Sequence, residues 1–244
     1  MKKFFAILIA LPLALPLAAC GEAPEADNGG ISVVATTFAP YDFARQLVGD
    51  MGTVSMLLPP GRESHSNEPT PKDILEIQNA DVFIYVGGES DAWVTDVLES
   101  VGEGVRAVTL MDCVELLEEE TVEGMEAEVH DHEHGEAGHE AEYDEHVWTS
   151  PRNAALICEK IAAALCEADP ANASVYNANL AVYSAELAKL DAAFTGIVAD
   201  GARKTIIFAD RFPLLYFARA YGLTYYAAFP GCSEDAEPSA ATVA

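Results

Sequence analysis

Strand-like and helix-like stretches alternate along the chain from residue 31, and this alternation restricts the fold more than any other feature of the sequence. Short stretches rich in β-branched and apolar residues are each followed by a stretch in which apolar residues recur with helical spacing. Such units build a parallel sheet that helices cover on both faces, and ligands bind at the carboxyl ends of its strands. The predicted strands are residues 32–37, 54–58, 81–86 and 106–110, and the predicted helices are residues 41–48, 92–101 and a helix that begins after Thr70.

The sequence around Thr70 is the clearest helix start in this part of the chain. Thr70 is a favoured N-cap residue, Pro71 takes the first helical position, and Asp73 takes the third, where a carboxylate can bond back to the cap. The stretch before Thr70 is therefore predicted to be a loop that leaves the carboxyl end of one strand and enters a capped helix.

Two further helices, residues 151–165 and 171–199, follow in the second half of the chain. The second has 29 residues and would span about 40 Å, so it can join two lobes as a rigid spine. After it, residues 205–208 and 224–229 have strand character and residues 213–221 have helical character.

The predicted fold is α/β, with two Rossmann-like lobes whose parallel sheets are joined by a long rigid helix. The N-terminal lobe is assigned to residues 31–168, the interlobe helix to residues 169–199 and a partial C-terminal lobe to residues 200–244. These last 45 residues are fewer than an independent lobe with its own core requires, so we predict that the second lobe is truncated.

The N-terminus has the order of regions that secretory signals have. Two lysines precede an apolar run that is too short to span a bilayer comfortably, and small residues follow it up to Cys20. Residues 17–21, Leu-Ala-Ala-Cys-Gly, resemble the lipobox of bacterial lipoproteins, although an ordinary signal followed by an accidental cysteine would also fit. We predict a signal peptide at residues 1–19, lipidation of Cys20, a tether at residues 20–30 and a location outside the cytoplasm, anchored to the cell membrane.

The net charge restricts the partners of the chain. Thirteen basic and 40 acidic residues give a formal charge of −27, so nucleic acid and anionic lipid are poor partners, whereas cations are attracted. If Cys20 is lipidated, four cysteines remain, and they are either disulfide-bonded or buried as free thiols. Cys158 and Cys166 cannot pair with each other, since eight residues of helix separate them by about 12 Å. The other two are Cys113 and Cys232.

Two histidines are candidate metal ligands because each lies beside carboxylates just before a helix start. His65 lies in the loop with the sequence LLPPGRESHSNEPTP, residues 57–71, and His146 lies in DEHVWTSPRNA, residues 144–154. Zn²⁺ accepts imidazole, thiolate or carboxylate in a tetrahedral array and does not require ligands close in sequence. A lone loop histidine is usually a surface residue, so the second motif is what favours a shared site.

At these two motifs the chain resembles the cluster A-I, or cluster 9, solute-binding proteins of zinc and manganese ABC importers. That family carries a Pro-Gly-x-x-x-His-x-x-Glu-Pro-Thr-Pro loop and an Asp-x-His-x-Trp-x-Ser-Pro-x-Asn-Ala segment, and the resemblance extends from residue 31 to the end. It implies a non-catalytic, monomeric protein that holds a metal ion in the cleft between two lobes. It also implies that His65 and His146 are ligands and that the partners are an ABC permease and its ATPase.

The chain departs from the family pattern in the second lobe. The position of the family's third ligand, usually His or Glu, holds Ala209, and the fourth belongs to a C-terminal region that the sequence does not contain. Asp210 could reach the metal instead, although an Asp beside Arg211 before a helix is more often a salt bridge or a cap. Cys232 could be a soft ligand, half of a disulfide or a buried thiol.

Residues 118–145 form a predicted mobile insertion rich in acidic residues and histidine. It resembles the His-rich loop of zinc-specific members of the family, which favours Zn²⁺ over Mn²⁺ as the ion. An extended chain must fold around an ion to bind it, so we expect weak, pH-dependent scavenging, and a solvated acidic insertion without a metal role is the alternative. The accessory histidines are His130, His132, His134 and His139.

Three other functions remain open on the sequence alone. One is a secreted zinc hydrolase with His65 and His146 as ligands and Glu145 or Glu63 as general base, although no His-Glu-x-x-His helix is present. The second is a manganese-specific binding protein, and the third is a metal buffer or adhesin of the same fold. We expect a zinc-binding protein that serves an importer and has no enzymatic activity.

Overall fold

The computed structural model of the chain describes residues 29–62, 64–65, 68–102, 104–125 and 142–233. In the first lobe the elements are β1 (Ile31–Ala35), α1 (Phe38–Val48), β2 (Gly52–Met56), α2 (Pro71–Gln78), β3 (Val82–Tyr85), a short 3-10 helix (Glu89–Asp91), α3 (Trp93–Val101), β4 (Arg106–Thr109), the 3-10 helices Met111–Cys113 and Val147–Thr149, and α4 (Pro151–Ala168). The remaining elements are a 3-10 helix (Pro170–Asn172), α5 (Ala173–Asp200), β5 (Thr205–Ile207), α6 (Leu215–Tyr221) and β6 (Thr224–Tyr226).

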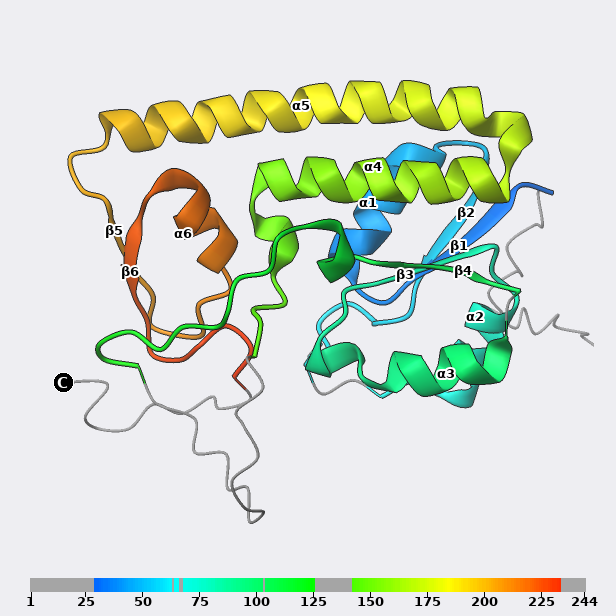
Figure 1. The fold of residues 1–244 in the computed structure, drawn as a ribbon, viewed down its shortest axis with the longest axis horizontal. Coiled ribbons are helices and arrows are strands. Elements are labelled where there is room, and N and C mark those ends of the chain that lie inside the picture. The colour runs from blue at the N-terminus through cyan, green and yellow to red at the C-terminus, as the bar shows by residue number, and fades with distance from the viewer. Residues whose placement is uncertain (1–28, 63, 66–67, 103, 126–141, 234–244) are drawn as a thin grey trace, which may run out of the picture.

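The strands form two parallel sheets. The first has the order β2-β1-β3-β4 and the second consists of β5 and β6. The long helix α5 runs past both of them along one side of the molecule (Figure 1). The predicted α/β fold with two lobes and a joining helix is confirmed.

Helices cover both faces of the four-stranded sheet (Figure 1). Successive side chains of a strand point to opposite faces, so Val33 packs in one core with α1 and α4, and Val34 packs in another with α2 and α3. The first core includes Leu47 and Ile157, both fully buried, and the second includes Ile77. This burial on both faces explains why the central strands β1 and β3 are nearly continuous apolar runs.

The predicted start of α2 is confirmed in detail. The Thr70 hydroxyl accepts a hydrogen bond from the backbone N–H of Asp73 at 3.3 Å, and the Asp73 carboxylate accepts one from the backbone N–H of Thr70 at 2.7 Å. These bonds satisfy donors that the first helical turn leaves unpaired. They fix the point at which the loop from β2 enters α2.

The helix α5 is attached to both lobes. Near its start, the buried Tyr176 donates a hydrogen bond from its hydroxyl to Asp169 at 2.6 Å, and the side-chain amide of Asn179 donates to the carbonyl of Leu47 in α1 at 2.9 Å. Further along, the Asp191 carboxylate accepts from Arg152 of α4 at 2.8 Å and from Tyr221 of α6 at 2.9 Å. The predicted role of this helix as a spine is consistent with these contacts.

The second lobe also contacts the first lobe directly. The buried Tyr216 of α6 accepts a hydrogen bond from the backbone N–H of Leu117 at 3.1 Å and donates one to the carbonyl of Asp144 at 3.0 Å. Arg219, one turn further along α6, forms an ion pair with Glu120. Residues 117–120 and 144 therefore form the surface on which the second lobe rests.

The predicted mobile insertion at residues 118–145 is too wide, because its ends belong to the folded lobe. Glu118 and Tyr143 form an isolated antiparallel bridge, and the side chains of Asp144 and Glu145 are buried. The prediction was based on the composition of the whole segment, which is rich in acidic and small residues, and composition does not show which residues pack against the lobe. The accessory histidines His130, His132, His134 and His139 lie outside the described residues, as do the predicted signal peptide and Cys20.

Two further observations bear on the predictions. The four cysteines in the described ranges, Cys113, Cys158, Cys166 and Cys232, are free thiols. None of the helices that the structure describes is both long enough and apolar enough to cross a membrane.

Candidate metal centre

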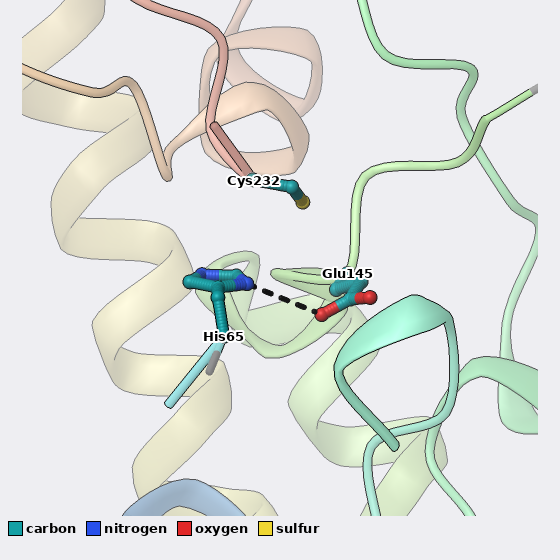
Figure 2. A group of neighbouring side chains, drawn as sticks. All are labelled: His65, Glu145 and Cys232. Atoms are coloured by element: carbon teal, nitrogen blue, oxygen red, sulfur yellow. Dashed lines mark ion pairs between the residues drawn. The ribbon is translucent and has the colours of Figure 1, made fainter. Parts of the chain in front are cut away.

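Four segments that are distant in sequence meet at the carboxyl ends of the strands. His65 lies in the loop after β2, Ser90 lies in the 3-10 helix after β3, Glu145 and His146 lie just before α4, and Cys232 follows β6. This is the edge of the sheets at which a parallel α/β fold binds ligands. Figure 2 shows His65, Glu145 and Cys232 pointing toward one another from three different segments.

His65 is held by a serine and a carboxylate. Its Nδ1 lies 2.8 Å from the hydroxyl oxygen of Ser90 and 3.5 Å from Oε2 of Glu145. The side chains of His65 and Glu145 are 11% and 6% exposed, so water screens these contacts only weakly. The imidazole is therefore fixed in orientation before any ligand arrives.

Glu145 receives two hydrogen bonds from Ser90. The Ser90 hydroxyl donates to Oε2 at 2.5 Å, and the Ser90 backbone N–H donates to Oε1 at 3.0 Å. Burial alone would raise the pKa of Glu145, but the hydrogen bonds from His65 and Ser90 together outweigh it and hold the pKa below its usual value. Glu145 is therefore a carboxylate near neutral pH.

The charge on Glu145 determines the tautomer of His65. A carboxylate only accepts hydrogen bonds, so the single proton of the Ser90 hydroxyl goes to Glu145, and the Ser90 oxygen must accept from Nδ1–H of His65. In this tautomer the lone pair of the ring is on Nε2. A metal-binding histidine usually has this arrangement, with its other ring nitrogen bonded to an oxygen acceptor.

His146 has a carboxylate partner of its own. Its Nδ1 lies 3.3 Å from Oδ1 of Asp144, and the same carboxylate oxygen accepts the backbone N–H of His146 at 2.8 Å. The His146 ring is 5.4 Å, centroid to centroid, from the ring of His65 and 5.5 Å from that of Trp148. The two predicted ligands thus lie side by side, each next to a carboxylate of the Asp144–Glu145 pair.

Cys232 completes a cluster with His65 and Glu145. One nitrogen, one oxygen and the sulfur of these three residues lie within 4.8 Å of one another, and among the described residues they form the one such group of three or more. The Cys232 sulfur is also 4.0 Å from Nδ1 of His146. Burial raises the pKa of the Cys232 thiol.

Asp210 is not part of this cluster. Its side chain is exposed, and its Oδ1 accepts a hydrogen bond from the backbone N–H of the next residue, Arg211, at 2.8 Å. Ala209 beside it is exposed as well. This contact is local and is not the predicted helix cap, since α6 begins at Leu215 with Leu214 as its N-cap.

Sequence reasoning missed Ser90, which orients His65, and Asp91, which secures the turn that carries Ser90. Ser90 and the buried Asp91 belong to the segment Gly-Gly-Glu-Ser-Asp that follows β3, and polar residues after a strand of a parallel sheet were the signal available. Oδ2 of Asp91 accepts the backbone N–H groups of Val86 and Gly87 at 2.8 and 3.1 Å, which secures the turn carrying Ser90. Burial raises the pKa of Asp91 to about 6.

Gly88 allows Glu145 to approach this turn. Its φ is +76°, and a Cβ added there would collide with the Glu145 carboxylate. A larger residue would therefore be strained and would displace Glu145 from Ser90. A hollow of about 710 Å³ beside β2 is lined by other residues, among them Phe38 and Arg62, and none of the three clustered side chains faces it.

Comparison with known proteins places this geometry in context. The family described as "Zinc-uptake complex component A periplasmic" matches residues 33–244. The zinc-binding lipoprotein AdcA of Streptococcus pneumoniae (strain ATCC BAA-255 / R6) is 35% identical over 244 residues, which are 100% of this chain and 47% of AdcA. The high-affinity zinc uptake system protein ZnuA of Bacillus subtilis (strain 168) is 36% identical over 249 residues, covering 100% of this chain and 76% of ZnuA.

Solved structures give the same picture. The Zn(II)-bound ZnuA-like domain of Streptococcus pneumoniae AdcA superposes with a TM-score of 0.70 at 29% identity, over 88% of this chain and 72% of that domain. The metal-dependent lipoprotein YcdH of Bacillus subtilis superposes with a TM-score of 0.71 at 32% identity, over 87% of this chain and 72% of YcdH. The chain spans about half the length of the AdcA relatives that it matches.

Proposed function

The chain belongs to the family of the periplasmic component A of zinc-uptake complexes, and from this membership we propose that it captures Zn²⁺ outside the cytoplasm and delivers it to the permease of an ABC importer. The family resemblance inferred from the two histidine motifs is confirmed. The relatives carry names that refer to zinc binding or zinc uptake, and the matching AdcA domain was solved with Zn(II) bound.

One observation carries the proposal for this chain in particular. His65 and His146 lie with their rings 5.4 Å apart, and Nδ1 of each ring faces a carboxylate, Glu145 for His65 and Asp144 for His146. This arrangement leaves the Nε2 lone pairs as metal donors and adds negative charge next to the ligands, which stabilises a bound cation. Neutral imidazole suits Zn²⁺ better than Mn²⁺, which prefers oxygen ligands.

A zinc hydrolase is less consistent with the geometry. Glu145, one of the two candidate general bases, already accepts hydrogen bonds from the hydroxyl and the backbone N–H of Ser90. A general base must be able to take a proton from a metal-bound water. The other candidate, Glu63, lies outside the described residues. We therefore propose a binding protein without enzymatic activity.

The finer parts of the proposal concern the cell. We infer that Cys20 is lipidated, which would anchor the chain at the outer face of the cell membrane beside its partners, a permease and an ATPase. The acidic chain attracts cations, and the histidines at positions 130, 132, 134 and 139 would raise the local concentration of zinc. The protein would act as a monomer.

A competitive zinc titration against a chelator of known affinity tests the proposed function. The protein is the chain with Cys20→Ser, which cannot be lipidated, beside the same chain with His65→Ala or His146→Ala. We expect one tightly bound zinc ion per chain and its loss in both variants. A variant in which the four accessory histidines are replaced by Asn is the control and should lose only weak binding. Tight binding that survives both ligand substitutions would contradict the proposal.

A further inference from the structure

Cys232 enters the metal centre from the second lobe, opposite the loop that carries His65 (Figure 2). Its backbone N–H donates a hydrogen bond to Oε1 of Glu119 at 2.8 Å, and its sulfur lies 4.0 Å from Nδ1 of His146. The same sulfur belongs to the cluster with His65 and Glu145 in which donor atoms lie within 4.8 Å. The thiol is therefore surrounded by the groups that would share a metal ion with it.

Gly231 brings the backbone of this segment against the His146 side of the site. A Cβ added at Gly231 would lie 2.8 Å from Oδ2 of Asp144, 2.9 Å from the carbonyl oxygen of Phe212 and 3.3 Å from Nδ1 of His146. Contacts as short as the first two do not occur in folded proteins, so the absence of a side chain is what permits the approach. The approach sets the position of the next residue, Cys232.

The other cysteines in the described part of the chain occupy ordinary packing environments. Cys158 is fully buried in the core formed with α1 and α4. The thiols of Cys113 and Cys166 donate to the carbonyl oxygens of Thr109 and Ala173 at 3.2 and 3.6 Å. Packing accounts for these three residues, whereas Cys232 lies beside two imidazoles and a carboxylate.

The cluster is compact enough for its side chains to share one ion, since donor atoms of His65, Glu145 and Cys232 lie within 4.8 Å of one another. Zn–S bonds of about 2.3 Å and Zn–N bonds of about 2.0–2.1 Å, at a tetrahedral angle, place sulfur and nitrogen about 3.6 Å apart. The Cys232 sulfur lies 4.0 Å from Nδ1 of His146, the ring nitrogen that faces Asp144, and within 4.8 Å of a ring nitrogen of His65, so it already lies beside both rings whose Nε2 atoms would share the ion with it. Residues 200–244 contain no histidine, and Cys232 is a residue of this stretch that lies beside the two imidazoles.

We propose that the Cys232 sulfur binds zinc directly, together with His65 and His146, and that this thiolate makes the site selective for zinc over manganese. The inference rests on the proposed function and specifies its ligands. When the Zn–S bond forms, the S–H bond breaks and the proton leaves to the solvent. Thiolate is a soft ligand that favours Zn²⁺, whereas Mn²⁺ favours oxygen donors, so a site with two imidazoles and a thiolate discriminates against manganese.

Loading the chain with Co²⁺ in place of Zn²⁺ tests the inference directly. The protein is again the Cys20→Ser chain, with Cys232→Ser as the variant and Cys166→Ser, which removes another half-buried free thiol, as the matched control. We expect a near-ultraviolet sulfur-to-cobalt charge-transfer band at one equivalent of metal. The band should be abolished by Cys232→Ser and retained in the Cys166→Ser protein.

Affinity gives the second readout. Loss of a residue that only hydrogen-bonds to a metal ligand lowers metal affinity by about tenfold or more. Because Cys232 is proposed to bind the ion itself, we expect Cys232→Ser to lower zinc affinity by at least that factor and to lower manganese affinity less. One tightly bound cobalt ion without a charge-transfer band in the unsubstituted protein would overturn the inference, whether or not the variant folds. If zinc binding in that case still depends on His65, the proposed function stands and only the role of Cys232 is refuted. If no His65-dependent metal binding is found, both proposals fail.

Discussion

Replacing Ser90 with Ala should weaken zinc binding although Ser90 is not expected to touch the metal. The Ser90 hydroxyl lies 2.8 Å from Nδ1 of His65 and 2.5 Å from Oε2 of Glu145. It donates its proton to the carboxylate and accepts the Nδ1–H of the ring, so it links the imidazole to the charged Glu145. Hydrogen bonds to charged groups contribute about 1.5–3 kcal/mol. Since about 1.4 kcal/mol corresponds to a tenfold change in affinity, we expect Ser90→Ala to lower zinc affinity by about 10–100-fold.

The assay is a competitive zinc titration of Ser90→Ala beside Ser100→Ala. The Ser100 hydroxyl donates to the carbonyl of Val97 in α3 at 2.7 Å, so its removal costs a comparable hydrogen bond that has no contact with His65 or Glu145. Ser100→Ala should bind zinc as the unsubstituted chain does. A residue that orients a metal ligand is expected to contribute at least about tenfold to affinity. If Ser90→Ala binds zinc within about twofold of the control, the orientation of His65 does not depend on Ser90.

Three further substitutions give expected outcomes. Because burial raises the pKa of Asp91 from 3.8 to about 6, the stability linked to its protonated form is complete below pH 3.8 and is lost as pH rises through about 6. The unfolding free energy of the metal-free protein should therefore fall by about 3 kcal/mol between pH 3.8 and about 6 because of Asp91. Asp91→Asn should lack this part of the decrease, as measured by denaturant unfolding at several pH values. Gly88→Ala forces a side chain into a left-handed conformation against Glu145, and it should lower the unfolding free energy by at least about 1 kcal/mol and weaken zinc binding, as measured by urea unfolding and titration. Tyr176→Phe removes the hydrogen bond to Asp169 and should lower the urea concentration at the midpoint of unfolding, with zinc affinity unchanged.

The elements whose signals are local could be predicted from the sequence. The start of α2 is determined by residues within one stretch of four, namely Thr70, Pro71 and Asp73. The hydrogen bonds expected between Thr70 and Asp73 are present. The long helix was expected at residues 171–199 and is found at Ala173–Asp200. The order β2-β1-β3-β4 was not predicted, because strand order depends on pairings between segments that are distant in sequence.

The same distinction applies to the metal centre. His65 and His146 were predicted because each lies in a recognisable motif, and the structure brings their rings together. The contacts that orient His65 were not predicted, since Ser90 and Glu145 are 55 residues apart in sequence and nothing in the sequence links them. Cys232 remained ambiguous for the same reason, because a thiol has no preferred role until its neighbours are known, and His146 lies 86 residues away.

The contacts between the lobes lead to a last prediction, which concerns shape. Tyr216 bonds to the backbone of Leu117 and Asp144, so the second lobe rests on the segment that leads into His146. Cys232 and His146 are thus positioned by protein contacts before metal binds, with the sulfur 4.0 Å from the His146 ring, so we expect binding without closure of one lobe over the other. A ligand changes the shape of a protein only by its different affinity for two arrangements. Small-angle scattering profiles recorded with zinc and with chelator should therefore nearly coincide, and a clear decrease in radius of gyration on adding zinc would mean that the contacts of Tyr216 open when the metal leaves.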